Sequence, residues 1–192
     1  MPSLPPNTVL IVIDVQQGFD DPLWGKRNNP RAEENIATLL KAWRTTDHPI
    51  IHIQHFSQEE NSPLRAGDPG SQFKEQAQPQ AHELIIQKSV NSAFIGTHLE
   101  QILHTHHFHT LVIVGLTTDH CVSTTTRMAG NLGFDTYVIS DATATFERTG
   151  YDGKKYTAAE IHDGALASLH HEFATVVDTQ HMLAMLNEQK KQ

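Results

Sequence analysis

Three residues that could carry out nucleophilic chemistry stand at the ends of apolar segments. Asp14 follows the run VLIVI, Lys88 ends the run ELIIQK, and Cys121 comes shortly after the run LVIVG. A thiol becomes a nucleophile when a neighbouring base takes its proton, and a carboxylate can be that base. A lysine ammonium can hold the carboxylate and favours the thiolate form of the cysteine. The three residue types therefore predict an activated cysteine nucleophile.

Cys121 is the single cysteine of the chain, so it cannot form an internal disulfide. It stands where a predicted helix begins, and the helix dipole and free backbone N–H groups there favour a thiolate. We therefore expect Cys121 to react with alkylating agents near neutral pH faster than a free cysteine. Each residue of the trio also has an ordinary alternative: Asp14 as a loop cap, Lys88 as a surface charge, and Cys121 as a small buried side chain.

Apolar strand-like runs alternate with helical patterns along the whole chain. The predicted strands are Val9–Val15, 50–54, Glu83–Lys88, Thr110–Gly115, Thr136–Ser140 and 174–179. The predicted helices are 35–43, 94–106 with Ile95 on its apolar side, Cys121–Leu132, Thr157–His171 and a last helix from Gln180. Such alternation, with near-continuous apolar strands, is typical of a parallel sheet covered on both faces. We expect one domain over residues 1–192, a three-layer α/β/α sandwich with a six-stranded, mostly parallel sheet.

The carboxyl ends of parallel strands meet at one edge of a sheet, where ligands bind in open α/β folds. Asp14, Lys88 and Cys121 all fall at or just beyond such ends, so we expect them to share one pocket. The polar segment Ser57–Gln80 is rich in Gln, Glu, Pro, Ser and Gly. Long loops inside compact domains are often functional, so this segment is expected to contribute to specificity.

Three motifs resemble those of one known family. The segments VLIVIDVQQGF, IIQKSVNSAF and VIVGLTTDHCVSTTTRMAGNLGFDTYVISDA are similar, in sequence and order, to those of the isochorismatase-like cysteine hydrolases. That family includes nicotinamidases and N-carbamoylsarcosine amidohydrolase, and the resemblance spans about the whole chain. It implies a Rossmann-like fold and a catalytic triad of Asp14, Lys88 and Cys121. Asp14 would take the thiol proton, Cys121 would attack a carbonyl, and water would release the acid from an acyl-thioester.

The resemblance also implies how the rest of the pocket is built. The family places a non-proline cis peptide after the strand that precedes the cysteine, which here would be Leu116–Thr117. The N–H groups of Thr117 and Cys121 would then form the oxyanion hole. Residues flanking the motifs are expected to bind substrate: Gln16, Phe19, Asn91, Phe94 and His120. Gln16 and Asn91 would orient a substrate amide or the lysine. Phe19 and Phe94 are equally compatible with ordinary core positions.

The chain departs from the nicotinamidase pattern in the histidines that bind a metal there. Nicotinamidases carry Asp-x-His and further histidines after the second strand. Here Ile53 stands in place of the aspartate, and no histidine occurs between His55 and His82. We therefore expect no metal and no cofactor, with His52 and His55 as strand and pocket-rim residues. The run HTHHFH, which contains His104, is interpreted as a solvated turn rather than as a metal site or pH sensor.

The composition of the chain indicates which kinds of molecule it binds. The formal net charge is −8 with scattered acidic residues, so the basic footprint of a nucleic-acid binder is missing. No apolar stretch is long enough to cross a bilayer, and the first residues lack the pattern of a signal peptide. Together with the single cysteine, this predicts a cytoplasmic protein with a small-molecule substrate and no nucleic-acid or membrane partner. The family commonly forms oligomers, so a homo-oligomer is expected.

The leading interpretation is a metal-free cysteine hydrolase acting on a small, non-peptide amide or carbamoyl compound. One alternative is an isochorismatase-type hydrolase of a vinyl ether, whose chemistry needs no thiol, so that the retained Cys121 counts against it. Another is a thiol redox protein or a non-catalytic binding module on the same fold. Redox function would be supported by a CxxC motif or a resolving cysteine, and neither is present. A dinucleotide-binding module would need GxGxxG after the first strand, where the chain reads IDVQQGFDD.

Overall fold

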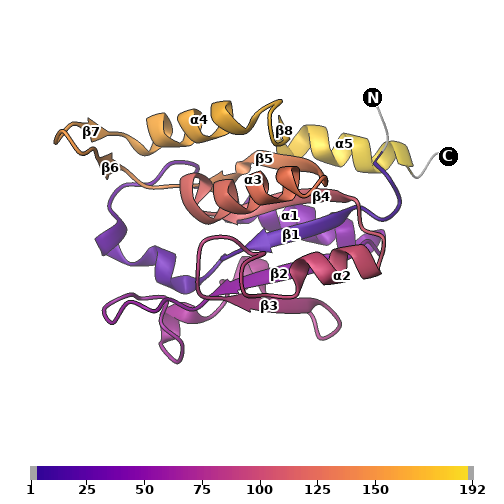
Figure 1. Ribbon diagram of the computed structural model, residues 1–192, viewed down its shortest axis with the longest axis horizontal. Coiled ribbons are helices and arrows are strands. Elements are labelled where there is room, and N and C mark those ends of the chain that lie inside the picture. The colour runs from indigo at the N-terminus through magenta and orange to yellow at the C-terminus, as the bar shows by residue number, and fades with distance from the viewer. Residues whose placement is uncertain (1–3, 190–192) are drawn as a thin grey trace.

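A parallel sheet forms the middle layer of the protein (Figure 1). The computed structural model describes residues 4–189. The strands are β1 (Val9–Ile13), β2 (Ile50–His55), β3 (Leu84–Lys88), β4 (Thr110–Leu116), β5 (Asp135–Ala144) and β8 (Thr175–Val177). They lie in the order β3-β2-β1-β4-β5-β8, and every neighbouring pair is parallel. The expected α/β sandwich with a six-stranded sheet is confirmed.

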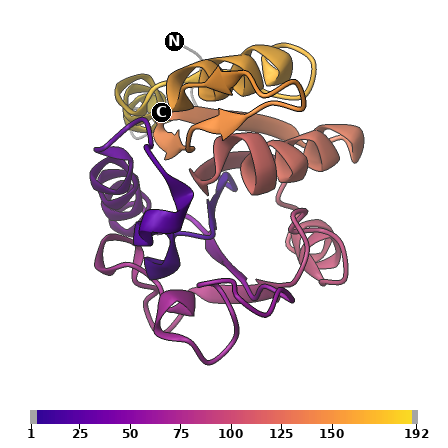
Figure 2. The same ribbon diagram turned by 90° about the vertical axis from the view of Figure 1, so that its left-hand side faces the viewer.

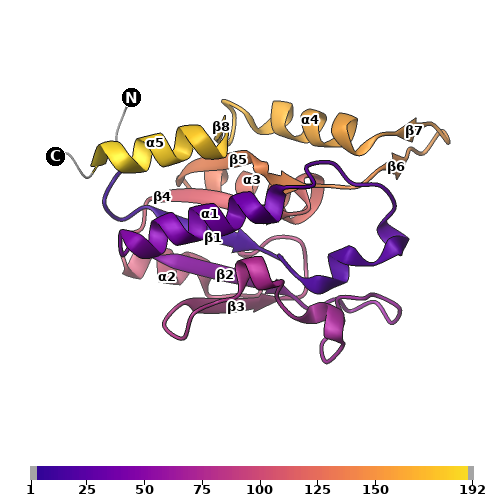
Figure 3. The same cartoon turned by 180° about the vertical axis from the view of Figure 1, so that it is seen from behind.

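Helices cover both faces of the sheet. Helices α2 (Leu99–Thr105), α3 (Ser123–Asn131) and α4 (Ala158–Leu169) lie on one face. Helices α1 (Ala32–Thr45) and α5 (Thr179–Gln189) lie on the other, seen from behind in Figure 3. Within residues 4–189, no helix combines the length and apolar character needed to cross a membrane.

Two apolar clusters, one on each side of the sheet, hold the layers together. Side chains alternate along each strand, so Ile11 and Ile13 join one cluster while Leu10 and Val12 join the other. Both faces of the strands are thus covered, which explains their near-continuous apolar sequence. Helix α1 adds Ile36, Leu39, Leu40 and Trp43, whose spacing places them on one buried face.

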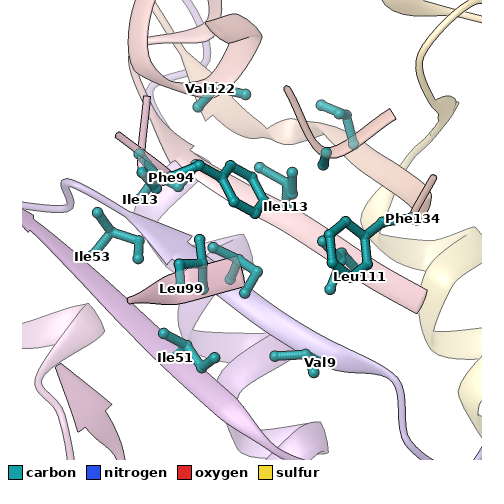
Figure 4. Packing of buried hydrophobic residues seen from close by; sticks show 14 of the residues in the cluster. Val9, Ile13, Ile51, Ile53, Phe94, Leu99, Leu111, Ile113, Val122 and Phe134 are labelled. Atoms are coloured by element: carbon teal, nitrogen blue, oxygen red, sulfur yellow. The ribbon is translucent and has the colours of Figure 1, made fainter. Parts of the chain in front are cut away.

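The predicted helix over residues 94–106 is wrong in its first turn. Helix α2 begins only at Leu99, because Gly96 adopts a φ of 71°, outside the right-handed helical region. Ile95, expected on the buried face of that helix, is consequently 53% exposed. Phe94 instead packs in the apolar cluster between the sheet and α2, where Figure 4 shows it near Ile113.

Two segments carry more structure than the sequence indicated. The Ser57–Gln80 segment contains 3-10 turns at Pro69–Ser71 and Glu75–Ala77, and it buries Leu64. A short hairpin, β6 (Arg148–Thr149) and β7 (Lys155–Tyr156), follows β5. The hairpin extends beyond the sheet on the same side as the Ser57–Gln80 segment (Figure 1). Both segments therefore reach the edge at which the parallel strands end.

Candidate active site

Asp14, Lys88 and Cys121 meet at the carboxyl edge of the sheet, onto which Figure 2 looks. Asp14 directly follows β1, and Lys88 is the last residue of β3. Cys121 lies in a π-helical turn, Thr118–Val122, between β4 and α3. All three side chains are buried. The structure thus brings together the three residues that the sequence singled out.

The ammonium of Lys88 is the centre of the arrangement. Its Nζ lies 2.6 Å from Asp14 Oδ2, 3.1 Å from His55 Nδ1 and 3.3 Å from Cys121 Sγ. An ammonium has three protons to donate and accepts none, so these partners use its full capacity. Burial acts to lower the pKa of Lys88, but its interactions with Asp14 and Cys121 outweigh burial and raise that pKa. Lys88 is therefore a permanent cation in the site.

The second carboxylate oxygen of Asp14 is available for proton transfer. Asp14 Oδ1 is buried and has no hydrogen-bond partner among residues 4–189. A carboxylate oxygen of Asp14, a ring nitrogen of His55 and Cys121 Sγ all lie within 4.8 Å of one another. A buried acceptor without a hydrogen-bond partner costs free energy, and this cost is relieved when a proton reaches the oxygen. This geometry allows Asp14 to accept the proton of the Cys121 thiol.

The expectation of an unusually acidic thiol is wrong. Burial of Cys121 and the neighbouring Asp14 carboxylate raise the pKa of the thiol, and the opposing effect of Lys88 does not compensate. Cys121 also lies inside the turn that precedes α3 rather than in the first turn of that helix. The thiol is therefore neutral in the free protein, and a base must remove its proton during the reaction.

The chain turns sharply between β4 and Cys121, and Gly115 makes that turn possible. Gly115 adopts a φ of 121°, and a Cβ there would lie 2.0 Å from the carbonyl oxygen of Ile13 on β1. The following Leu116–Thr117 peptide bond is cis. Beyond it, the Thr118 hydroxyl lies 2.9 Å from Nδ1 of the buried His162 on α4. These contacts set the path of the backbone that carries Cys121.

Asp14 and Cys121 line a cavity of about 230 Å³, and Lys88, which bonds both, lies outside its lining. Of the residues expected to bind substrate, Phe19, Asn91 and His120 line it, as does Thr117. Sequence reasoning did not name Trp24 or Arg148, which also line the cavity. The Ser57–Gln80 segment, expected to contribute to specificity, supplies Ser57, Glu59, Ser62 and Leu64. Trp24 packs beside Phe19 with ring centroids 5.3 Å apart, so the two form an aromatic wall. No local motif marks Trp24, which lies on a 3-10 turn, or Arg148, which lies on the hairpin.

Gln16 and Phe94, which were expected to bind substrate, make structural contacts instead. Gln16 is fully buried, and its amide bonds the backbone of His55 in both directions and the carbonyl of Ser71. It does not line the cavity, because these bonds turn it toward the ends of β1 and β2. Phe94 stacks on Phe134 in the core with ring centroids 6.1 Å apart, rather than forming a pocket wall.

The histidines near the site differ in their partners. His52 Nε2 lies 2.8 Å from Glu83, on the side away from the trio. His55 lines the cavity, as a pocket-rim residue should, and also reaches Lys88. Asp14, His55 and Cys121 have the donor atoms and spacing to hold a metal ion. The Lys88 ammonium bonds all three, however, so it occupies the position that such an ion would need.

A larger cavity, about 450 Å³, lies at the opposite edge, where β2 and β3 begin. Its walls include Arg44, His48 and Phe108. No cysteine, serine or threonine lines it, whereas the smaller cavity holds Cys121 beside a carboxylate. The chemistry of the side chains therefore places the candidate active site at the carboxyl edge.

Comparison with known proteins identifies close relatives of this chain. The family profile of the isochorismatase domain matches residues 8–181. The isochorismatase family protein YrdC of Bacillus subtilis is 52% identical over 174 residues, which cover 91% of this chain and 93% of that protein. A crystal structure of an isochorismatase-family protein from Chromobacterium violaceum matches with a TM-score of 0.95 at 42% identity, covering 98% of this chain and 97% of the other. Nicotinamidase 3 of Arabidopsis thaliana is more distant, at 26% identity over 180 residues, 90% of this chain and 74% of that enzyme.

Proposed function

Because this chain belongs to the isochorismatase family of hydrolases, we propose that it cleaves the C–N bond of a small amide or carbamoyl compound through an acyl-thioester on Cys121. One observation carries the proposal. The Lys88 ammonium bridges the Asp14 carboxylate and the Cys121 sulfur, and Asp14 and Cys121 both line the cavity. A buried thiol, a base and a fixed cation are the groups that nucleophilic attack on a carbonyl requires.

The first half of the reaction uses Asp14 as the general base. The thiol proton passes to Asp14 Oδ1, and Cys121 Sγ attacks the substrate carbonyl to form a tetrahedral oxyanion. The N–H groups of Thr117 and Cys121 are the proposed donors to that oxyanion. The C–N bond then breaks, and Asp14 returns the proton to the departing nitrogen, which leaves as ammonia or an amine. The product of this half is an acyl-thioester on Cys121.

The second half repeats the proton transfers with water. Asp14 takes a proton from a water molecule, which attacks the thioester carbonyl. The C–S bond breaks, the acid is released, and the sulfur recovers its proton from Asp14. Lys88 remains protonated throughout and stabilises the carboxylate and the departing thiolate. The raised pKa of the thiol fits this scheme, because attack and proton transfer then occur only when a carbonyl is in place.

The size and walls of the cavity limit the substrate. A cavity of about 230 Å³ admits only a small molecule. Phe19 and Trp24 offer it an aromatic wall, while Asn91, Glu59 and Arg148 offer polar groups. The Ser57–Gln80 segment contributes Leu64 and Glu59, which supports its role in specificity. The homo-oligomeric state and cytoplasmic location expected from the sequence remain predictions.

Turnover of a panel of small amides and carbamoyl compounds, followed by ammonia release, tests this proposal. Wild-type protein should release ammonia from at least one member, and Cys121→Ala should not, because no other group can form the thioester. Mass spectrometry of enzyme quenched during turnover should find the acyl group on the peptide that contains Cys121. Turnover that survives in Cys121→Ala would contradict the mechanism. Cleavage of a vinyl ether by that variant would favour the thiol-independent alternative.

A further inference from the structure

We infer that His55 is a positioning residue for Lys88: its neutral imidazole accepts a hydrogen bond from the ammonium and keeps it between Asp14 and Cys121. The inference rests on the proposed function for its kinetic consequences. Its structural part stands on contacts alone. His55 Nδ1 lies 3.1 Å from Lys88 Nζ, and the two residues are register partners on β2 and β3.

The partners of His55 specify a single protonation state. An ammonium can only donate, so the Nδ1 atom that faces Lys88 must present its lone pair. The imidazole proton therefore resides on Nε2. The backbone of Val90 acts to raise the pKa of the ring, as a carbonyl near a ring N–H does. The ammonium that faces Nδ1 thus selects one neutral tautomer of the ring.

Gln16 fixes the backbone from which His55 projects. The side-chain carbonyl of Gln16 accepts from the His55 N–H at 2.8 Å, and its amide donates to the His55 carbonyl at 2.9 Å. Gln16 is fully buried, so these bonds are shielded from water. A continuous set of contacts therefore runs from Gln16 through His55 to Lys88, and from there to both reacting groups.

Titratable groups from four parts of the fold face His55. They are Lys88 on β3, Asp14 after β1, Cys121 in the turn after β4, and Glu59 in the Ser57–Gln80 segment. Burial and the Lys88 charge lower the pKa of His55 more than Asp14 and Glu59 raise it. Protonation of His55 would turn Nδ1 into a donor facing the ammonium, so the contact would be replaced by repulsion. Activity should therefore fall at acid pH as His55 titrates.

Two substitutions at one position separate acceptor function from packing. His55→Gln keeps an oxygen that can accept from Lys88 but cannot titrate, whereas His55→Leu fills space without an acceptor. The matched control is His52→Gln, which removes a buried histidine of the same strand that bonds Glu83 instead. On a substrate from the amide panel, His55→Leu should lose roughly ten- to a hundredfold in kcat with little change in KM. His55→Gln should stay within about fivefold of wild type at neutral pH and extend its activity to lower pH.

A spectroscopic measurement makes the inference independent of turnover. In protein labelled with 15N-histidine, the signal that disappears in His55→Gln should show the Nε2–H tautomer and titrate below the range of an ordinary histidine. The inference would be overturned if His55 carried its proton on Nδ1 or titrated like an ordinary histidine. It would also be overturned if His55→Leu were fully active, or if the activity of His55→Gln fell at acid pH as that of wild type does. If the tautomer signature is present but no amide is hydrolysed, the proposed function fails while the contact between His55 and Lys88 stands.

Discussion

Replacement of Asp14 by asparagine should make Cys121 more reactive toward alkylating agents while it abolishes turnover. The carboxylate of Asp14 lies within 4.8 Å of Cys121 Sγ and is one cause of the raised pKa of that thiol. The substituted amide would keep the shape of the side chain but not its charge. Lys88 would still face the sulfur at 3.3 Å and would favour the thiolate. The same substitution removes the proposed general base.

The distance between the two groups sets the size of the effect. At the upper limit of 4.8 Å and an effective dielectric constant of about 20, two unit charges repel by about 3.5 kcal/mol. That free energy lowers the pKa of the thiol by about 2.5 once the carboxylate is removed. At a pH below the thiol pKa, the thiolate fraction rises about tenfold each time that pKa falls by one. The nucleophilicity of the thiolate also falls with its pKa, with a Brønsted slope of about 0.4–0.5. The net gain in the rate of alkylation is roughly 20-fold, against a loss of turnover of about a hundredfold or more.

Two measurements test this prediction. The rate of labelling by iodoacetamide across a range of pH reports the reactivity of the thiol, and steady-state turnover reports the loss of the general base. Asp119→Asn is the matched control, because Asp119 is close to Cys121 in the chain but bonds Thr145 and Arg148. Its labelling rate should stay near that of wild type. If Asp14→Asn were alkylated no faster than wild type, the Asp14 carboxylate would not control the thiol. If it turned over normally, Asp14 would not be the base.

Three further outcomes are expected. Burial acts to raise the pKa of Glu83, but hydrogen bonds from Arg44, the Gln80 N–H and His52 lower it to about 2. Glu83→Gln should therefore lower the free energy of unfolding, measured in urea at neutral pH, by about 2 kcal/mol. This difference should be lost as the pH falls from the unfolded-state pKa of about 4.5 toward 2. Gly115→Ala should lower the melting temperature far more than Gly133→Ala, since both have positive φ but only the first places its Cβ against backbone, and equal losses would contradict this explanation. Treatment with EDTA should leave amide turnover unchanged, and a rate that collapses and returns with zinc or iron would show that a metal takes part.

The architecture and the reacting trio could be predicted from the sequence. Strands buried on both faces must be apolar throughout, so runs such as VLIVI and LVIVG predict a parallel sheet without any knowledge of contacts. A parallel sheet brings its carboxyl ends to one edge, so polar residues at those ends meet whatever the loops do. That is why Asp14, Lys88 and Cys121 could be placed together. Local breaks were less certain, as the late start of α2 after Gly96 shows.

The electrostatic state of the site was decided only by the tertiary structure. A position near the start of a helix suggested an acidic thiol, but the pKa depends on burial and on the nearest charges in space. Burial and the Asp14 carboxylate together outweigh the opposing effect of Lys88 and raise the pKa of Cys121. The use of Gln16 for the backbone of His55, and of His55 for Lys88, follows from the pairing of β1, β2 and β3 rather than from any motif. Trp24 and Arg148 reach the cavity through the paths of long connections, which leave no periodic pattern in the sequence. Patterns along the chain therefore determined the elements and their order, whereas protonation, partners and cavity walls arise from contacts between residues distant in sequence, which only the folded chain creates.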